Sequence, residues 1–405
     1  MTAMHQVVPV LLPGDATSDH SLQLQRLLLD MGFESEIFVQ AVHPSLADRA
    51  RLLGEIPTSR QPDTLWLYQL SAASGIAEWL AGRREPFAIN YHNVTPPHFY
   101  RRWEPAVAAD QRWALRQTAH LADRASTAIC DSSFNAANLA LLGYSSTFVA
   151  PVLVDVDRFS IEPARDLMSS LGAAKSEGGS DWLFIGRIAP HKAQHRVVGA
   201  FAAYRRLYDP SARLALVGGG STSRYGSALS RYTEALGLGA AVTVASGIDH
   251  AALVAHLVNA DVCVSLSEHE GFCVPILEAL AHDLPVVARD AGAVAETLGQ
   301  GGLILNARDS DDPAVVAAAV HTVLGDGELR ARLAIAGRQR LDHFSLANSR
   351  AVMVQAIHGF VERAGMSSTR SSMGRASVGG SAGALKAASA GSAGSPPRSP
   401  MGLSA

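Results

Sequence analysis

Two glutamates eight positions apart carry the strongest chemical signal in the chain. Glu270 and Glu278 lie in the segment Ser267-Glu-His-Glu-Gly-Phe-Cys-Val-Pro-Ile-Leu-Glu278, which follows an apolar run at residues 261–266. This pattern predicts a strand, a sharp polar turn and a helix, a geometry that aims backbone N–H groups and a helix N-terminus at an anion. Carboxylates beside an anion suit a ligand that also carries hydroxyl groups. We therefore expect a phosphate joined to a sugar.

Two cations follow another predicted strand. Arg187 and Lys192 lie in Gly186-Arg-Ile-Ala-Pro-His-Lys192, directly after an apolar run at residues 182–185. Open α/β sheets bind ligands at the carboxyl ends of their strands. Arg can grip a phosphate with two hydrogen bonds and Lys adds a point charge, so the pair would neutralise a diphosphate without a metal. The alternative is two solvated surface cations, but Lys192 is one of only three lysines in the chain.

A histidine and a glycine-rich turn follow two further strands. His92 lies in Asn90-Tyr-His-Asn-Val-Thr-Pro-Pro-His98, after the predicted strand at residues 87–91. It either points into a ligand cleft or is a buried histidine with its hydrogen bonds satisfied. Leu216-Val-Gly-Gly-Gly-Ser221 allows a ligand to approach the backbone closely, although a tight strand–helix connection explains it as well. It fits neither the dinucleotide fingerprint nor the phosphate loop.

The elements that must position these residues alternate between strand and helix. The first series predicts strands at residues 7–12, 36–39, 64–70, 87–91, 126–130 and 147–154, with helices at 21–31, 76–80, 103–125 and 134–142. The second predicts strands at 182–185, 213–217, 242–245, 261–266, 285–288 and 302–305, with helices at 194–208, 228–236, 251–259, 274–282, 313–324, 328–339 and 346–363. Such alternation is typical of α/β proteins, in which a parallel sheet is covered on both faces.

Bulk composition narrows the classes of protein. The 405 residues suffice for two domains, 48% of them are hydrophobic, and a net charge of −3 gives no support to a nucleic-acid surface. Cys130, Cys263 and Cys273 lack metal-like or disulfide-like spacing, which fits a reducing compartment. We find neither a signal peptide nor an apolar run long enough to span a membrane, so we expect a cytoplasmic protein.

Taken together, the motifs resemble a known family. Gly186-Arg-(x4)-Lys192, Leu216-Val-Gly-Gly-Gly220 and Glu270-Gly-Phe-Cys-Val-Pro-Ile-Leu-Glu278 are similar to the nucleotide-sugar domain of retaining glycosyltransferases of family 4. The resemblance covers roughly residues 5–364. It implies the α/β GT-B architecture, in which two doubly wound, Rossmann-like parallel-sheet domains face each other across a cleft. Tyr91-His-Asn-Val-Thr-Pro-Pro97 and Gly14-Asp-Ala16 resemble a bacterial subgroup of mannosyl- and rhamnosyltransferase-like members.

With this resemblance the chain divides into five parts. We expect an acceptor-side domain at residues 1–165 and a linker at 166–180, where the alternating pattern breaks. A nucleotide-sugar domain follows at 181–342, and a helix at 343–365 is expected to cross back to the first domain. The Ser/Gly/Ala-rich segment 366–405 is predicted to be disordered, because it offers few groups that could form a core.

The resemblance also assigns roles to matching residues. It implies catalytic roles for His92, Arg187, Lys192 and Glu270. It implies donor-binding roles for Gly14, Gly186, Arg187, Lys192, Gly218, Glu270, Gly271, Phe272, Cys273, Val274 and Glu278. Arg187 and Lys192 would hold the diphosphate, Glu270 the sugar hydroxyls, Glu278 the ribose, and His92 would lie over the sugar. The chain departs from the family at Gly14, which stands alone where members often have more glycines, and at Cys273, which is often Gly.

The implied reaction is transfer of a hexosyl group, with mannosyl as one candidate, from a nucleoside diphosphate sugar to an acceptor hydroxyl with retention. The acceptor would be a glycan, a lipid-linked glycan or a small molecule, which suits polysaccharide biosynthesis. We identify no Asp-x-Asp metal site and no cofactor, and therefore predict metal independence. Two alternatives stay open: a nucleotide-sugar-binding regulatory protein without transfer activity, and a nucleotide-sugar epimerase of the same architecture.

The acceptor side is poorly marked in the sequence. His98-Phe-Tyr-Arg-Arg-Trp103 mixes aromatic and basic residues, which suits peripheral contact with the inner face of a membrane that carries the acceptor. It suits a helix start that packs Phe99 and Trp103 inward somewhat better. No nucleic-acid partner is expected.

Overall fold

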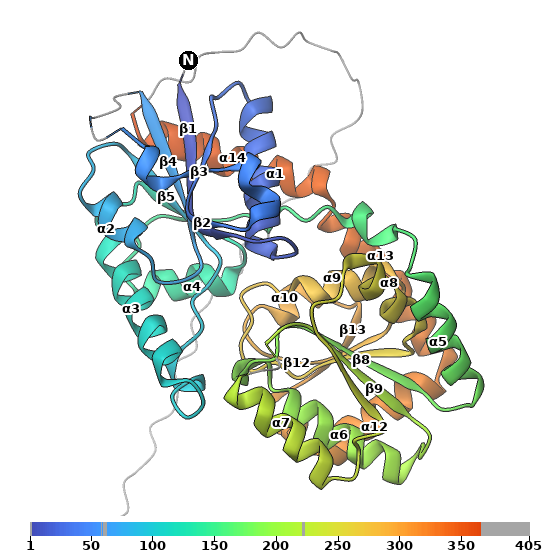
Figure 1. Ribbon diagram of the computed structural model, residues 1–405. Helices are drawn as coiled ribbons and strands as arrows, with labels where there is room; N and C mark the ends of the chain where they lie inside the picture. Colours follow the sequence, from blue (N-terminus) through green and yellow to red (C-terminus); the bar gives the residue numbers. More distant parts are fainter. Residues whose placement is uncertain (1, 58, 60–62, 221–222, 366–405) are drawn as a thin grey trace, which may run out of the picture. The chain divides into compact units, whose positions relative to one another are not determined.

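Two parallel β-sheets organise the part of the chain that the structure describes (Figure 1). The structure is a computed structural model, and it describes residues 2–57, 59, 63–220 and 223–365. Every paired strand in both sheets runs parallel to its neighbour. Helices connect the strands, as parallel pairing requires. The predicted α/β class with two Rossmann-like domains is therefore confirmed.

The first sheet has the strand order β3-β2-β1-β4-β5-β6-β7. Its strands are β1 (Ala3–Leu11), β2 (Ile37–Val42), β3 (Arg51–Leu52), β4 (Thr64–Leu70), β5 (Phe87–Tyr91), β6 (Thr127–Cys130) and β7 (Thr147–Val149). The strand order changes direction between β1 and β4, which is the topological switch point of the sheet. Such a point opens a crevice at the carboxyl ends of the strands.

The second sheet has the order β10-β9-β8-β11-β12-β13, with its switch point between β8 and β11. Its strands are β8 (Asp181–Ile185), β9 (Arg213–Val217), β10 (Val242–Ala245), β11 (Val262–Ser265), β12 (Val286–Arg289) and β13 (Gly302–Leu305). The cation-bearing loop follows β8 and the glutamate-bearing loop follows β11. Both predicted motifs therefore leave the sheet at the same switch point.

Helices and short 3₁₀ turns fill the connections. The first domain contains α1 (Ala16–Asp30), α2 (Gly75–Ala81), α3 (Pro105–Leu121) and α4 (Ser133–Leu141), with 3₁₀ turns η1 (Pro44–Arg49), η2 (Leu53–Glu55) and η3 (Pro97–Phe99). After η4 (Val156–Ser160) come α5 (Arg165–Ser176), η5 (Pro190–Lys192), α6 (Gln194–Leu207), α7 (Arg224–Ala235), α8 (His250–Asn259), α9 (Val274–Ala281), α10 (Val294–Leu298), α11 (Ala307–Asp311), α12 (Pro313–Gly325), α13 (Gly327–His343) and α14 (Leu346–Arg363).

Burial on both faces explains the strand sequences. All seven residues of β4 are buried, including the polar Gln69, which lies at the carboxyl end beside the site. A strand buried on both faces is expected to be continuously apolar, so a buried amide must have hydrogen-bond partners. Gln69 is therefore a candidate for a role beyond packing.

The last helix packs against the first sheet, beside β1 and β4 (Figure 1). Met353, Ile357 and Phe360 of α14 are fully buried in a cluster with residues of the first domain, namely Met4, Leu24, Leu65, Leu67, Ala88 and Ile129. The chain thus returns to the first domain after completing the second. Packing of an apolar helix face provides most of the stability of such a helix.

Local signals explain where the elements differ from the prediction. The helix predicted from residue 21 begins at Ala16, because the Asp15 carboxylate accepts the Ser18 N–H at 2.9 Å and caps it. The extended segment predicted at residues 147–154 is a strand only over β7. The segment 166–180, predicted to be a linker, contains α5, which is held to α8 by the Ala164 N–H bond to the Ala251 carbonyl. The predicted tail, 366–405, lies outside the described residues.

No helix in the described ranges combines the length and the hydropathy needed to cross a bilayer.

The packing of α14 can be tested by truncating its most buried aromatic residue. We expect Phe360→Ala to lower the free energy of unfolding by about 3 to 5 kcal/mol, because a fully buried ring is replaced by a cavity. Chemical denaturation followed by circular dichroism measures this. Gln355→Ala, at an exposed position of the same helix, should stay within about 0.5 kcal/mol of the parent. Equal effects of the two changes would contradict the packing described.

Candidate functional site

A buried ion pair joins the two loops at the switch point of the second sheet. The Lys192 ammonium lies 2.7 and 2.8 Å from the two carboxylate oxygens of Glu270. Burial disfavours the charge on Lys192, but Glu270 outweighs this and the pKa of Lys192 is raised. The pair brings together two of the predicted catalytic residues. It also means that Lys192 is already neutralised before any ligand arrives.

The turn after Glu270 is built to present its backbone. Cys273 caps α9 with a left-handed conformation, φ 76° and ψ 64°, which explains why glycine suits this position. Burial raises the pKa of the Cys273 thiol, so it remains a neutral thiol. Within the described part of the chain, the N–H groups of residues 271–274 have no hydrogen-bond acceptor. Four free donors at a helix N-terminus form a site for an anion.

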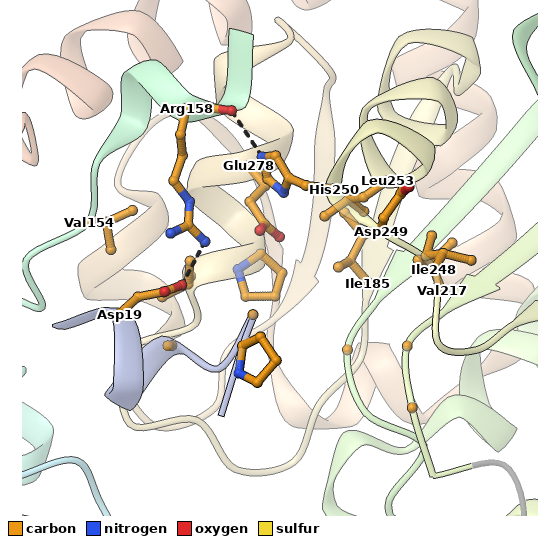
Figure 2. A pocket seen from close by; sticks show the side chains of 18 of the residues that line it. Asp19, Val154, Arg158, Ile185, Val217, Ile248, Asp249, His250, Leu253 and Glu278 are labelled. Carbon is orange, nitrogen blue, oxygen red and sulfur yellow. Dashed lines mark hydrogen bonds and ion pairs between the residues drawn. The ribbon is translucent and has the colours of Figure 1, made fainter. Parts of the chain in front are cut away.

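A cavity of about 960 Å³ lies beside this turn (Figure 2). Its lining includes the predicted residues Gly14, Gly186, Arg187, Gly218, Val274 and Glu278. An apolar stretch of the wall comes from Ile185, Val217, Ile248 and Leu253. Arg187 makes no ion pair with any described carboxylate, so its charge is available to a ligand. Apolar walls with a few polar groups are typical of small-molecule sites.

Gly218 is required where β9 approaches the cation loop. Its φ of 149° is rare for other residues, and a Cβ there would overlap the carbonyl of Gly186. The glycine-rich turn therefore serves close packing of two strand ends that line the cavity. The prediction that the backbone itself approaches a ligand there stays a prediction.

Glu278 is a buried carboxyl group in the wall of the larger cavity. Burial raises its pKa to about 7, and the nearby Arg158 partly opposes this rise. No described residue donates a hydrogen bond to the Glu278 carboxyl group. Arg158 instead forms an ion pair with Asp19 of α1, at 2.7 Å, and accepts the His250 N–H on its carbonyl at 2.9 Å (Figure 2).

A smaller cavity of about 210 Å³ adjoins the larger one. Both are lined by Ala16, Val274 and Pro275, so they are neighbours along one surface. The smaller cavity is also lined by Gly271, Phe272 and Cys273 and by the charged or titratable residues His92, Asp131, Lys192 and Glu270. The structure thus brings His92 of the first domain to the cavity wall that carries Lys192 and Glu270. Arg187 lines the larger cavity instead, so the two predicted diphosphate-binding cations line different cavities, although the charge of Arg187 still acts on Lys192.

Residues from both domains meet beside the smaller cavity. The Ser132 hydroxyl donates to the Gly271 carbonyl at 2.7 Å, and His269 Nε2 lies 2.8 Å from the Asn93 amide oxygen. The Tyr100 hydroxyl lies 3.1 Å from His191 Nδ1. These contacts hold the loops before Lys192 and around Glu270 against the first domain.

The aromatic and basic segment after the Pro-Pro turn packs largely inward. Trp103 contacts Tyr225 of α7 at a ring distance of 5.4 Å, and Phe99 lies near His191 and His269. Arg101 and Arg102 are exposed, whereas the aromatic side chains are partly buried. The packing interpretation of this segment is favoured over a membrane-facing one.

The sequence argument against a metal was incorrect in one respect. The chain contains two Asp-x-Asp triplets, at residues 155–157 and 309–311. Asp311 is held by Arg196 and Arg289, and Asp155 lines the larger cavity. Among the described residues no three His, Cys, Asp or Glu side chains are grouped so that they could hold a metal. Metal independence stays a prediction.

Four side chains at the site were not predicted as site residues: Gln69, Asp131, Asp19 and Arg158. For Asp131 the sequence did contain a signal. The available signal was its position directly after β6, next to the strand that precedes His92. Arg158 and Asp19 are far apart in the sequence and carry no local pattern.

The paired doubly wound sheets, with cavities at the carboxyl ends of their strands, define a protein of the GT-B fold. Sucrose-phosphate synthase of Thermosynechococcus elongatus superposes with a TM-score of 0.69 at 20% identity, over 89% of this chain and all of that one. The Anabaena protein HepE, solved with UDP-glucose, gives a TM-score of 0.67 at 18% identity, over 88% of this chain and all of that one.

The family comparison is carried by the second domain. Residues 173–340 match the family model described as glycosyl transferases group 1. A curated relative from Mycolicibacterium smegmatis, named GDP-mannose-dependent alpha-(1-6)-phosphatidylinositol monomannoside mannosyltransferase, is 32% identical over 208 residues. That alignment covers 49% of this chain and 51% of the relative, so the chain spans about half the length of this relative.

The burial of Glu278 makes stability depend on pH in a defined direction. Its pKa is about 7 in the folded protein against an ordinary value of 4.5, so the folded state binds more protons between these values. The free energy of unfolding therefore falls as pH rises through this window, by about 3 kcal/mol from this group. Glu278→Gln should remove that loss and be more stable than the parent at pH 8.

Urea denaturation at pH 5 and at pH 8 measures this effect. Glu362→Gln, at an exposed position on α14, is the matched control and should keep the parent's dependence on pH. If the free energy of unfolding of Glu278→Gln depends on pH as it does in the parent, Glu278 is not the buried acid that causes this dependence.

Proposed function

We propose that the chain is a retaining, metal-independent glycosyltransferase that moves a hexosyl group from a nucleoside diphosphate sugar to an acceptor hydroxyl. The observation that carries this proposal is the pair of adjoining cavities. The larger one contains Arg187, which has no ion-pair partner among the described residues, and the free Val274 N–H group at the start of α9. The other is lined by the Lys192–Glu270 ion pair. An anion-binding region next to a polar pocket without net charge suits a diphosphate joined to a sugar.

The larger cavity would take the nucleotide. Arg187 and the free Val274 N–H group would bind the diphosphate, and the N–H groups of residues 271–273 would reach it from the adjoining smaller cavity. Glu278 would accept hydrogen bonds from the ribose hydroxyls. The apolar wall formed by Ile185, Val217, Ile248 and Leu253 would contact the base. A Glu278 carboxylate has enough lone pairs to accept hydrogen bonds from two ribose hydroxyls.

The smaller cavity would take the sugar. Glu270 keeps further lone pairs beside its bonds to Lys192, and these can accept sugar hydroxyls. In the proposed reaction the bond between the anomeric carbon and the phosphate oxygen breaks, and the acceptor oxygen attacks from the same face. The acceptor proton passes to the leaving phosphate, which yields a nucleoside diphosphate and a glycoside. Fixed positive groups stabilise the phosphate more as its charge grows.

Mannosyl is the first candidate for the transferred group. The Mycolicibacterium smegmatis relative is named for a GDP-mannose-dependent transferase. A Mycobacterium tuberculosis relative named GDP-mannose-dependent alpha-mannosyltransferase is 29% identical over 258 residues. These names support GDP-mannose as the first donor to test. The acceptor is proposed only as a glycan, lipid-linked glycan or small molecule with a free hydroxyl.

Arg187 provides the sharpest test of the diphosphate site. We expect Arg187→Ala to lower kcat/KM by about 10²- to 10³-fold, because a charged donor to the leaving phosphate is lost. Its stability should stay close to that of the parent, since Arg187 has no ion pair to lose within the described residues. Lys192→Ala serves as a contrast, because it also leaves Glu270 buried without its partner and should destabilise the fold by about 3 to 5 kcal/mol. Transfer rates near normal in Arg187→Ala, measured with EDTA present, contradict this assignment.

The donor can be identified by thermal shift. We expect GDP-mannose to raise Tm more than UDP-, ADP- or dTDP-sugars, because a ligand that binds only the folded state stabilises it by about 2.7 kcal/mol at 100 times Kd. Arg187→Ala should show a smaller shift. Binding without transfer to any acceptor favours the regulatory alternative, and conversion of the donor alone favours the epimerase. A flat response to all four nucleotide classes contradicts the proposed function.

A further inference from the structure

His92 and Asp131 form a buried pair in the wall of the smaller cavity. They directly follow β5 and β6, and Gln69 lies near the end of β4, so three adjacent strands supply one cluster. His92 Nδ1 lies 2.9 Å from Asp131 Oδ2, and His92 Nε2 lies 2.7 Å from Gln69 Oε1. Both side chains of the His92–Asp131 pair are about 5% exposed or less. Both ring nitrogens of His92 are therefore engaged by the protein.

A chain of amides shows which way the Gln69 side chain faces. The Gln6 amide nitrogen donates to the Ser21 carbonyl at 2.9 Å, and a carbonyl can only accept. The Gln6 oxygen therefore accepts from the Gln69 amide nitrogen, at 2.8 Å, and the Gln69 oxygen faces His92. An oxygen at that position requires a proton on His92 Nε2. The Ser21 carbonyl, acting through the two amides, thus determines that His92 Nε2 carries a proton.

The other side of the ring faces a carboxyl group. A proton must lie between His92 Nδ1 and Asp131 Oδ2, because two lone pairs at 2.9 Å would repel each other. Burial raises the pKa of Asp131, and His92 opposes that rise. Asp131 Oδ1 has no hydrogen-bond partner among the described residues. An asparagine would hold a neutral ring equally well, and burying it would cost less free energy than burying a carboxyl group. A buried carboxyl group here therefore needs another explanation.

Apart from Asp131, the titratable groups around the His92 ring do not offset a positive charge on it. His20 of α1 lies 5.0 Å from the ring and accepts the Leu153 N–H on Nδ1 at 2.9 Å. Burial, followed by the charge of His92, holds its pKa well below the ordinary value. Burial raises the pKa values of Tyr91 and Cys130 to about 12, so both are neutral near pH 7. Lys192 and Glu270, which line the same cavity, neutralise each other.

We propose that Asp131 is a positioning residue that keeps the His92 imidazole doubly protonated beside the sugar pocket. Gln69 accepts the Nε2 proton and the Asp131 carboxylate accepts the Nδ1 proton. The proposal rests on the proposed function for its consequence: a cationic ring at this wall stabilises the negative charge that builds on the leaving phosphate. The proposal extends that function, because it adds the His92–Asp131 ion pair of the first domain to the charged groups of the second domain.

The protonation state can be measured without any activity. Nitrogen-15 NMR of the histidine side chains in the ligand-free protein, recorded at the pH of the transfer assay, should show both His92 nitrogens protonated. His92→Gln identifies the signal. In Asp131→Asn the amide nitrogen can donate to Nδ1, so the ring should carry a proton on Nε2 alone. A singly protonated His92 in the parent protein overturns the proposal.

Kinetics test the consequence. Asp131→Asn should lower kcat by about 10²-fold with the KM for the donor within about threefold, because the ring stays in place but loses its charge. Asp181→Asn, a buried aspartate at the start of β8 that binds Arg213, is the matched control and should leave kcat unchanged. An unchanged kcat in Asp131→Asn overturns the proposed role. If no donor binds or reacts, the proposed function fails while the NMR result still decides the state of the pair.

Discussion

The buried ion pair between Lys192 and Glu270 is the interaction on which the site depends. Removing two charges from water costs several kcal/mol per ion, and only close, well-formed contacts offset this. Here both carboxylate oxygens lie within 2.8 Å of the ammonium. The contact is possible because β8 and β11 are neighbours at the switch point, although almost eighty residues separate the two partners. The sheet order thus places the two loops against each other.

Several features near this pair reduce stability rather than increase it. Cys273 adopts a left-handed backbone that favours glycine, and Glu278 is buried without a hydrogen bond from any described residue. The N–H groups of residues 271–274 also lack partners within the described chain. Unsatisfied groups and strained conformations tend to gather at sites where a ligand completes the contacts. Their concentration around one turn supports a site for a ligand more strongly than any one of them does.

The sequence predicted the second domain's contribution better than the first domain's. Glu270, Glu278, Arg187 and Lys192 lie in two short segments whose residue types and spacing show in the sequence itself. Gln69 lies on β4 and Asp131 directly follows β6, and only the order β4-β5-β6 brings them to His92. Pairing of strands distant in sequence has no local pattern. The same reason explains why the Arg158–Asp19 pair was missed, whereas the two-domain α/β class was predictable from the alternation of strands and helices.

Charge is distributed differently in the two adjoining cavities. In the smaller one Lys192 faces Glu270 and His92 faces Asp131, each pair across less than 3 Å. In the larger one Arg187 has no carboxylate partner among the described residues, and free N–H groups of the α9 turn lie at the boundary. A neutral ligand portion that carries hydroxyls matches the first environment, because the paired groups still offer hydrogen-bond donors and acceptors. An anionic portion matches the second. This difference between two adjoining cavities supports the proposed nucleoside diphosphate sugar as the ligand.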